Sequence, residues 1–313
     1  MVALKKVSIV VPVLNEEKTL EACLKSIKGN SYKNKELIVI DNGSTDGSQK
    51  IARKYADKFF IEKKKGIVFA KNLGIKKASG EFIAFTDADC IVSKDWLKEL
   101  ISCFKDNSIA SAGGPNLTPK DDSDFSHHVG KTIELLSFLG AEYGSREKKN
   151  AEVKHNPGCN VIYRKGVLKE LRGFNRGMIS NEDPELDYRI REKGFKLMFN
   201  PKAIVWHYRK GSYKKFFRQA FSFGLGKMQL IKLHPKSSRY YQFLPSLNLV
   251  LLLLLLLFSI NLFFYLAATE ILAVILIGLY TNLKFKLNPL IISSLIFIWV
   301  FGWALGFIRG ITK

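Results

Sequence analysis

The sequence predicts an α/β fold: a mostly parallel sheet flanked by helices, followed by C-terminal transmembrane helices. Short apolar runs rich in β-branched residues alternate with helix-length amphipathic segments through the first 210 residues. That alternation is typical of a parallel sheet covered by helices. From residue 245 onward the chain is almost entirely apolar, which indicates membrane-spanning helices.

The expected strands are short apolar runs that end at a polar residue or at proline. The first, residues 7–11, is nearly all apolar and is ended by Pro12, as in a strand buried on both faces of a parallel sheet. Further strands are expected at residues 36–40, 58–61, 81–85, 110–114, 195–199 and 204–206, and the apolar core pattern also resumes at residues 157–163. Apolar residues at helical spacing predict helices at residues 16–28, 48–56, 66–78 and 93–105.

Polar side chains lie just past the carboxyl ends of three expected strands. They are Asn15, Glu16, Asp41, Asp87 and Asp89. Ligands of open parallel sheets bind at this edge. Asp87 and Asp89 offer two hard oxygen ligands in a tight turn, which suits a divalent cation that bridges a diphosphate. Two acids in a loop are more often solvated or capping residues, so the position at the end of a buried strand is what favours a metal site.

The charge indicates an anionic partner. The net charge is +21, from 49 Lys and Arg against 28 Asp and Glu, which is compatible with nucleic acid or with an anionic membrane surface. No zinc-finger, RNA-binding or basic-zipper motif is present in the sequence. The apolar tail therefore favours the membrane, and we expect no nucleic-acid partner.

The cysteines indicate buried, reduced thiols. Cys23, Cys90, Cys103 and Cys159 show no CxxC spacing, so the spacing predicts neither a disulfide framework nor a zinc site. No signal peptide precedes the first expected strand. We therefore expect residues 1–210 to stay in the cytoplasm.

Residues 211–244 are expected to form a basic amphipathic helix region in the membrane interface. No Asp or Glu occurs between residues 193 and 269. Within residues 213–233, apolar side chains recur at helical spacing among basic ones, as in interfacial helices: Phe217, Phe221, Met228 and Ile231. An ordinary basic surface helix is the alternative.

Residues 245–313 are expected to hold about three membrane spans. Residues 247–268 and 287–308 are each long enough to cross a bilayer, and residues 271–283 are short. Two spans with a re-entrant segment are the alternative. Lys284 and Lys286 lie in a basic loop, and the positive-inside rule then places residues 1–210 on the cytoplasmic side of a multi-pass cell-membrane protein.

Seven short segments follow one another in a specific order. They are residues 10–16, 40–47, 70–72, 85–89, 158–160, 173–174 and 181–189. The first four resemble the nucleotide-sugar half of glycosyltransferase family 2, the inverting enzymes with a GT-A fold, and the last three resemble its acceptor half. The resemblance covers about residues 5–210, and the tail is similar to that of membrane-anchored members. It implies a Rossmann-like GT-A catalytic domain at residues 1–210.

The resemblance implies roles for residues on the donor side. The matching donor-binding residues are Pro12, Asn15, Glu16, Asp41, Lys71, Asp87 and Asp89. Pro12, Asn15 and Glu16 would border the base and ribose. Asp41 would contact the nucleoside and Lys71 would flank it. Asp87 would approach the ribose and phosphates, and Asp89 would bind a divalent metal, Mn or Mg. A UDP-sugar is the default donor, with GDP and dTDP left open.

On the acceptor side the resemblance implies roles for Gly158, Asn160, Glu182 and Asp183. Asp183 would be the general base and Glu182 its catalytic neighbour. Helix capping is the alternative role for Asp183. A sugar hydroxyl is a poor nucleophile at neutral pH, so its attack needs a carboxylate that removes its proton. An anionic phosphate acceptor would need no such base, so the pair favours a hydroxyl acceptor.

Among the histidines, only His207 is a candidate ligand. A late histidine can supply a further metal ligand in GT-A enzymes, although a lone histidine is more often structural. His127 and His128 are expected to be surface residues.

The sequence thus predicts a metal-dependent glycosyltransferase of the hexosyltransferase type, acting in cell-envelope glycan synthesis. It would move one sugar from a nucleotide sugar to a hydroxyl of a lipid-linked acceptor at the cytoplasmic membrane face. Residues 218–223 lack the Arg-Trp pair of processive family members, which favours transfer of a single sugar. The alternatives are a polyprenyl-phosphate sugar synthase and a non-catalytic membrane scaffold.

Overall fold

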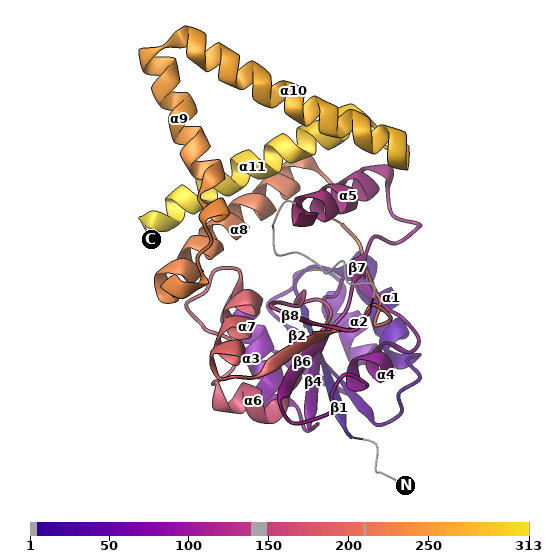
Figure 1. Cartoon of the computed structure of the whole chain (residues 1–313). Helices are drawn as coiled ribbons and strands as arrows, with labels where there is room; N and C mark the ends of the chain where they lie inside the picture. Colours follow the sequence, from indigo (N-terminus) through magenta and orange to yellow (C-terminus); the bar gives the residue numbers. More distant parts are fainter. Residues whose placement is uncertain (1–4, 139–148, 210, 313) are drawn as a thin grey trace. The chain divides into compact units, whose positions relative to one another are not determined.

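The computed structural model describes residues 5–138, 149–209 and 211–312 (Figure 1). The chain divides into two compact units. The first comprises the described residues of 1–119, 142–177 and 182–208, and the second those of 120–141, 178–181 and 209–313. The three segments predicted from composition, at 1–210, 211–244 and 245–313, stay a prediction.

An eight-stranded sheet forms the centre of the first unit, in the order β3-β2-β1-β4-β9-β6-β10-β8. Its strands are β1 (Val7–Val13), β2 (Lys35–Asp41), β3 (Lys58–Ile61), β4 (Phe82–Phe85), β6 (Ile109–Gly113), β8 (Ala151–Val153), β9 (Val161–Arg164) and β10 (Lys196–Phe199). Only β9 and β8 run against the other strands of this sheet. The predicted mostly parallel sheet is confirmed, and β8 is a strand that the apolar pattern did not reveal.

The sheet is covered by helices on both faces, as predicted (Figure 1). On one face lie α1 (Glu17–Lys28), α2 (Ser48–Tyr55) and α4 (Trp96–Ile101); on the other lie α3 (Ile67–Lys77), α6 (Lys165–Glu170) and α7 (Glu182–Glu192). Successive strand residues point to opposite faces, so Ile9 and Val11 pack under α1 while Val10 packs on the side of α3. This double burial explains why β1 is apolar throughout.

A separate three-stranded sheet lies within the same unit, in the order β5-β11-β7. Its strands are β5 (Cys90–Val92), β7 (Asn116–Leu117) and β11 (Val205–His207). β5 and β7 are too short for the sequence pattern to predict. The antiparallel pairing of β11 with β5 sets His207 opposite Cys90, directly after the 87–89 loop.

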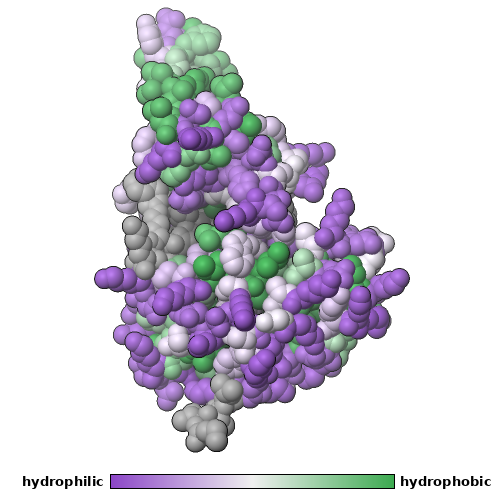
Figure 2. All heavy atoms as spheres, turned by 90° about the vertical axis from the view of Figure 1, so that its right-hand side faces the viewer, coloured by the Kyte–Doolittle hydropathy of each residue, from purple (hydrophilic) through white to green (hydrophobic). Residues whose placement is uncertain are grey.

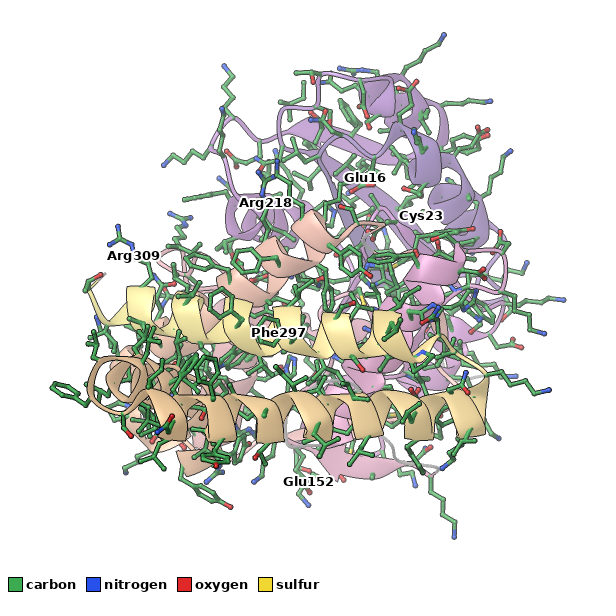
Figure 3. The ribbon with its side chains drawn as sticks, turned by 90° about the horizontal axis from the view of Figure 1, so that it is seen from above. Glu16, Cys23, Glu152, Arg218, Phe297 and Arg309 are labelled. Atoms are coloured by element: carbon green, nitrogen blue, oxygen red, sulfur yellow. The ribbon has the colours of Figure 1, made fainter. Side chains whose placement is uncertain are left out.

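The second unit is helical in its described part. It contains α5 (Asp124–Phe138), α8 (Tyr213–Leu233), α9 (Leu244–Phe258), α10 (Ile260–Phe285) and α11 (Pro289–Ile311), with 3-10 turns at Pro235–Ser237 and Tyr240–Gln242. α10 and α11 run side by side (Figure 3). Exposed apolar side chains gather over this end of the chain (Figure 2).

The apolar tail is divided differently from the prediction. The span expected at 247–268 is wrong, because the helix breaks at Ser259, whose backbone angles of φ −157° and ψ 83° are not helical. The short segment expected at 271–283 lies inside the 26-residue helix α10. Among the described residues, two helices, α10 and α11, are long and apolar enough to cross a membrane, and α9 is shorter. The sequence could not predict this break, because residues 247–268 are almost entirely apolar and contain no Gly or Pro that would indicate the end of a helix.

Small residues bring α8 and α11 together. A Cβ at Gly224 would overlap the Trp303 carbonyl, and one at Gly306 would overlap the Phe221 carbonyl. In α11 the glycines recur every fourth residue, at Gly302, Gly306 and Gly310, which is a known pattern for close packing of apolar helices. The helix expected at 213–233 is present. Its buried face includes Phe216, Ala220, Gly224 and Leu230, so the predicted line through Phe217 and Phe221 is only partly buried.

Replacing Gly306 with leucine is expected to destabilise the helical unit by about 1–3 kcal/mol. The neighbouring atom is a backbone carbonyl oxygen of Phe221, which cannot rotate away from a new side chain. The check is the unfolding temperature of the purified protein in detergent, which should fall. Gly166→Leu is the control, because a Cβ at that helical glycine meets open space. Equal unfolding temperatures for the Gly306 variant and the unaltered protein would contradict the packing argument.

The expectation that His128 is a surface residue is wrong. Its side chain is buried. The ring Nδ1 lies 2.6 Å from the Asp124 carbonyl oxygen, and Nε2 accepts a hydrogen bond of 2.8 Å from the Asn288 backbone N–H. His128 therefore joins α5 to the start of α11.

Candidate active site

The end of β2 forms a tight, polar loop around Asp41. One oxygen of Asp41, Oδ1, accepts hydrogen bonds from the N–H groups of Gly43 and Ser44, at 3.0 and 3.1 Å, and from Gln49 Nε2 at 3.0 Å. Gly43 has φ +94°, a conformation that glycine adopts at little cost. The other oxygen, Oδ2, is buried and has no hydrogen-bond partner among the described residues. Buried acceptors are normally satisfied, so this atom is available to a ligand.

The loop after β1 holds the Asp41 loop in place. Asn15, at φ 56°, accepts a hydrogen bond of 2.8 Å from the Thr45 N–H through its side-chain oxygen. The Glu16 N–H donates to Ser48 Oγ at 2.9 Å. Pro12 is buried within β1, opposite Ile40. These three predicted donor-side residues therefore lie beside Asp41, and the Asn15 amide is already used by the protein's own backbone.

The loop after β4 brings Asp87 and Asp89 next to His207. One side-chain donor atom of each residue lies within 4.8 Å of the others. The Nε2 atom of His207 is 3.2 Å from Asp89 Oδ1. Two carboxylates and an imidazole form a donor set that suits a divalent cation, so the three residues predicted from sequence near the diphosphate do meet.

Electrostatics in this cluster are strongly perturbed. Burial raises the pKa of Asp87 to about 7, and the nearby Asp89 charge adds to that rise. Burial would lower the pKa of His207, but the adjacent Asp89 carboxylate outweighs it and raises the pKa to about 10. His207 is thus a protonated partner of Asp89 near neutral pH, and a cation that binds its Nε2 must displace that proton.

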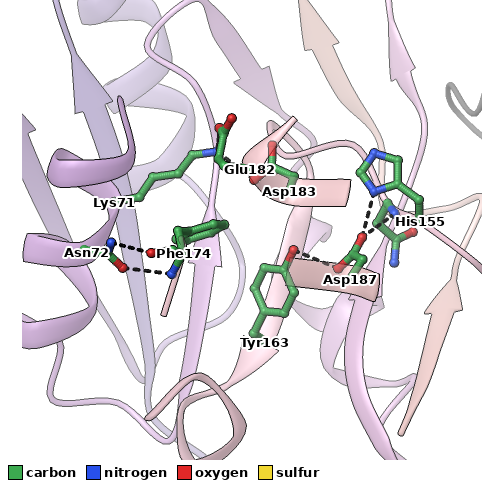
Figure 4. Close-up of polar contacts among 9 residues, drawn as sticks. Lys71, Asn72, His155, Tyr163, Phe174, Glu182, Asp183 and Asp187 are labelled. Carbon is green, nitrogen blue, oxygen red and sulfur yellow. Dashed lines mark hydrogen bonds and ion pairs between the residues drawn. The ribbon is translucent and has the colours of Figure 1, made fainter. Parts of the chain in front are cut away.

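On the acceptor side, Lys71 bridges the two predicted catalytic carboxylates (Figure 4). Lys71 Nζ lies 2.8 Å from Glu182 Oε1 and 2.7 Å from Asp183 Oδ1. Only 2% of the Lys71 side chain is exposed, against 16% for Asp183. The base predicted from sequence is therefore the more accessible partner of an ion pair whose lysine is fully enclosed. This contact was not part of the sequence prediction, which assigned Lys71 to the nucleoside.

The ion pair tunes all three groups. Burial alone would lower the pKa of Lys71, but the carboxylates of Asp183, Glu182 and Asp87 raise it above its ordinary value. Burial pushes the pKa of Glu182 upward, and the Lys71 charge outweighs it, so that pKa lies below its usual range. Burial raises the pKa of Asp183 to about 6, although Lys71 offsets part of the rise. Asp183 is thereby suited to take a proton near neutral pH.

A second row of contacts fixes α7, which carries Asp183. One turn further along, the fully buried Asp187 accepts hydrogen bonds from Tyr163 Oη at 3.1 Å and His155 Nδ1 at 2.7 Å (Figure 4). Sequence reasoning missed His155 and Tyr163. The four-residue spacing from Asp183 to Asp187 was the available signal, since it places both on one helix face.

The loop at 172–175 is tied to α3 beside Lys71. Asn72 Nδ2 donates to the Phe174 carbonyl, and the Phe174 N–H donates back to Asn72 Oδ1, both at 2.9 Å (Figure 4). The Phe174 ring then lies 5.0 Å from Lys71 Nζ, a favourable cation–π distance. Asn72 and Phe174 belong to two of the seven sequence segments, but their mutual contact is visible only in the structure.

Gly158 and Asn160 differ in their relation to the carboxylates. A Cβ at Gly158 would overlap Asp183 Oδ2, so only glycine lets this loop approach the base. Asn160 is fully buried; it accepts from Trp96 Nε1 at 2.7 Å and donates to the Pro115 and Ala203 carbonyls at 2.8 and 2.7 Å. These contacts are all with the protein itself, so we interpret Asn160 as a residue that holds the loop carrying Gly158 in place.

The predicted residues thus gather at one edge of the sheet. The charges of Asp87 and Lys71 act on each other, which links the Asp87–Asp89–His207 cluster to the Lys71–Glu182–Asp183 group. Asp41 ends β2, and β1 separates β2 from β4, so the ends of β2 and β4 are about 10 Å apart at the usual strand spacing. The site therefore offers a hydrogen-bond acceptor at Asp41, a cation-binding set at residues 87, 89 and 207, and a base at Asp183. These groups suit the transfer of a chemical group from an activated, anionic donor to a nucleophile.

Comparison with known sequences agrees with this geometry. The sequence model of Glycosyl transferase family 2 matches residues 8–172, which is more than half of the chain. The chain belongs to glycosyltransferase family 2. The resemblance drawn from the seven short segments is therefore confirmed, and the chain is a glycosyltransferase.

Two curated glycosyltransferases are similar to this family 2 member. Glycosyltransferase AglE of Haloferax volcanii is 27% identical over 234 residues, covering 72% of this chain and 73% of AglE. A dolichyl N-acetyl-alpha-D-glucosaminyl phosphate 3-beta-D-2,3-diacetamido-2,3-dideoxy-beta-D-glucuronosyltransferase of Methanococcus voltae is also 27% identical. That alignment spans 327 residues, 98% of this chain and 97% of the relative.

Two solved structures share the fold. The mannosyltransferase PcManGT from Pyrobaculum calidifontis, in complex with GDP-Man and Mn²⁺, superposes with a TM-score of 0.63 at 16% identity, covering 98% of this chain and 88% of that one. TarS 1–349 of S. aureus, in complex with UDP-GlcNAc, gives a TM-score of 0.53 at 19% identity, covering 76% and 75%. The GT-A assignment of the family 2 enzyme is confirmed by these similarities.

Proposed function

We propose that this family 2 enzyme transfers one sugar, with inversion, from a nucleotide sugar to a hydroxyl of a lipid-linked acceptor at the cytoplasmic face of the cell membrane. The observation that carries the proposal is the Asp183 carboxylate, held 2.7 Å from Lys71 Nζ with its pKa raised by burial to about 6. A single in-line displacement inverts the anomeric carbon and needs one base on the acceptor side.

The donor's base would pair with Asp41. Its buried Oδ2 atom has no partner among the described residues and can accept a hydrogen bond from a ring N–H of the nucleobase. Uracil and guanine both carry such a donor group. A UDP-sugar is the default, and GDP- and dTDP-sugars remain to be compared.

The residues after β4 fit a divalent cation, Mn²⁺ or Mg²⁺. Asp89 and His207 would hold it, with Asp87 within 4.8 Å of both donor atoms. A bound cation would neutralise charge that develops on the leaving diphosphate. The chain's own contribution is to hold the carboxylates in place: His207 keeps Asp89 oriented through the 3.2 Å contact. The structure similar to this one that contains Mn²⁺ supports a metal requirement.

Asp183 would remove the proton of the attacking hydroxyl. Lys71 and Glu182 orient it, and the absent side chain of Gly158 leaves room beside its Oδ2 atom. A phosphate acceptor is already anionic and would gain little from such a base. The name of the Methanococcus voltae relative, a transferase acting on a dolichyl-linked sugar phosphate, also supports a lipid-linked sugar acceptor.

The helical unit would anchor the enzyme to the membrane. α10 and α11 are long and apolar enough to cross a bilayer, and the basic residues that precede α9, Lys232, Lys236 and Arg239, fit a cytoplasmic catalytic domain under the positive-inside rule. Residues 211–244, with α8 at their start, would keep the active site near lipid head groups, where anionic surfaces attract basic segments. The close packing of α8 on α11 supports this proposal, because it attaches the basic helix to a helix long enough to cross the membrane.

The test combines donor selection with product analysis. One nucleotide sugar, with Mn²⁺ or Mg²⁺, should raise the unfolding temperature selectively, corresponding to about 2.7 kcal/mol at a concentration of 100 times Kd. Incubation with that donor and polyprenyl-linked sugars should yield a glycosidic bond. A sugar phosphodiester made from polyprenyl phosphate would indicate a synthase instead, and the absence of any transfer or donor hydrolysis would indicate a non-catalytic scaffold.

Metal binding has its own comparison within this test. His207→Ala should raise the cation concentration needed for half-maximal transfer, because one ligand is lost. His127→Ala is the matched control outside the cluster. Unchanged metal activation in the His207 variant would reject its role as a ligand.

A further inference from the structure

Two thiols lie beside the Asp87–Asp89–His207 cluster, and the proposed transfer reaction uses neither of them. Cys90 begins β5 directly after Asp89, and Cys159 lies in the loop that precedes β9. Both cysteines are buried: Cys90 is 1% exposed and Cys159 is 5% exposed. Both are free cysteines, and both are therefore able to ligate a metal.

The fold gathers these thiols around His207. One donor atom each of Cys90, Cys159 and His207 lies within 4.8 Å of the other two. Asp89 Oδ1 lies beside two members of this group, 3.9 Å from Cys90 Sγ and 3.2 Å from His207 Nε2. In a tetrahedral zinc site, with Zn–S of about 2.3 Å and Zn–N or Zn–O of about 2.0–2.1 Å, neighbouring ligand atoms are about 3.3–3.8 Å apart. The two Asp89 distances already lie in or near that range, and the donor atoms of Cys90, Cys159 and His207, all within 4.8 Å of one another, need only small side-chain rotations to reach it.

Tertiary structure builds this group from distant parts of the sequence. The β5–β11 register sets His207 opposite Cys90. From β7, the other edge of the same small sheet, Asn116 Nδ2 donates to Cys159 Sγ at 3.5 Å. A donor that orients a ligand sulfur in this way is typical of the groups that support metal ligands. The lack of CxxC spacing therefore does not exclude a zinc site here.

We propose that Asp89, Cys90, Cys159 and His207 form a zinc site that competes with the hard cation of the transfer reaction. Two thiolates select zinc over Mg²⁺ and Mn²⁺, which prefer oxygen ligands. Four protein ligands leave no open coordination position, as in structural rather than catalytic zinc sites. Because Asp89 and His207 would serve both ions, zinc excludes the second cation and inhibits transfer. The zinc site stands by itself, and only this inhibition rests on the proposed function.

Cobalt is the direct probe of the zinc site. Full-length protein in detergent, kept reduced and shown by thiol titration to hold four free thiols, is titrated with Co²⁺. A thiolate-to-cobalt absorption band is expected at one equivalent and should disappear on addition of Zn²⁺. Absence of that band in protein with reduced thiols would overturn the proposal.

Variants identify the ligands. Cys90→Ser and Cys159→Ser should each weaken the cobalt band and lower zinc affinity, whereas Cys103→Ser, a control at another buried thiol, should retain both. Asn116→Ala keeps all four ligands and should weaken zinc binding by about 10–100-fold. Unfolding temperatures show which variants are folded. A cobalt band that survives in folded Cys90→Ser and Cys159→Ser would refute the assignment.

Inhibition is measured separately, as transfer at saturating Mn²⁺ with increasing free Zn²⁺. Zinc should inhibit the unaltered enzyme, and Asn116→Ala should need a zinc concentration about 10–100-fold higher. Cobalt binding without any transfer activity would leave the zinc site established and the proposed function refuted. Cobalt binding with transfer that zinc leaves unaffected would refute the competition.

Discussion

Asp183→Asn is expected to lower kcat/KM by about 10²–10⁴-fold, the usual contribution of a positioned general base. The substitution keeps the shape of the side chain, and Lys71 keeps its 2.8 Å contact with Glu182. The fold and the donor site should therefore persist. The measurement is steady-state transfer, together with the donor-induced rise in unfolding temperature, which should be unchanged.

The control for this variant is Asp106→Asn, an exposed carboxylate in the same unit. It should retain wild-type rates. If Asp183→Asn kept more than a tenth of the activity while binding donor normally, Asp183 would be a helix-capping or ion-pairing residue and the base would have to be another group.

Lys71→Met is expected to lower the free energy of unfolding at neutral pH by about 3–5 kcal/mol, the usual effect of removing one partner of a buried ion pair. The methionine leaves the carboxylates of Glu182 and Asp183 buried without their shared cation. The measurement is chemical or thermal unfolding in detergent. Lys76→Met on the same helix is the control, because Lys76 is exposed and its loss should have little effect.

The same variant should change the pH dependence of both stability and rate. Lys71 lowers the pKa of Asp183, which is about 6 with the lysine present, so its removal raises that pKa further. The folded state then binds more protons than the unfolded state between about pH 4 and the raised pKa, and stability falls as pH rises through that window. The destabilisation should be largest at neutral or higher pH and should shrink in acid.

Transfer requires deprotonated Asp183, so its rate in the unaltered enzyme should fall below about pH 6. In Lys71→Met this acid limb should move to higher pH. An acid limb at the same pH in both proteins would show that Asp183 is not the group that titrates, even if the variant is less stable.

The site was predictable where its residues follow strand ends. Asp41, Asp87 and Asp89 come directly after apolar runs that could only be buried strands, and parallel strands bring such ends to one edge. Glu182 and Asp183 were recognised through a motif. The pairing of Lys71 with both acids was not predictable, because it joins α3 to the first turn of α7, more than 100 residues further along the chain.

In the C-terminal tail, too, some features could be predicted from the local sequence and others depend on tertiary contacts. Its apolar character was plain, but the break at Ser259 carries no Gly or Pro signal, and the glycines at 302, 306 and 310 acquire meaning only against α8. His128 shows the same limit, since its two hydrogen bonds reach Asp124 and the distant Asn288.

By itself, the sequence determined the layered α/β fold, the family, and the acids available at the strand ends, because apolar periodicity and short motifs are local properties of the chain. Tertiary structure alone decided which groups meet: Lys71 with Asp183, Asp89 with His207, and Cys90 with Cys159. Those meetings depend on strand register and helix packing between segments far apart in the chain, and burial at the resulting contacts sets the charges on which catalysis and metal binding rely.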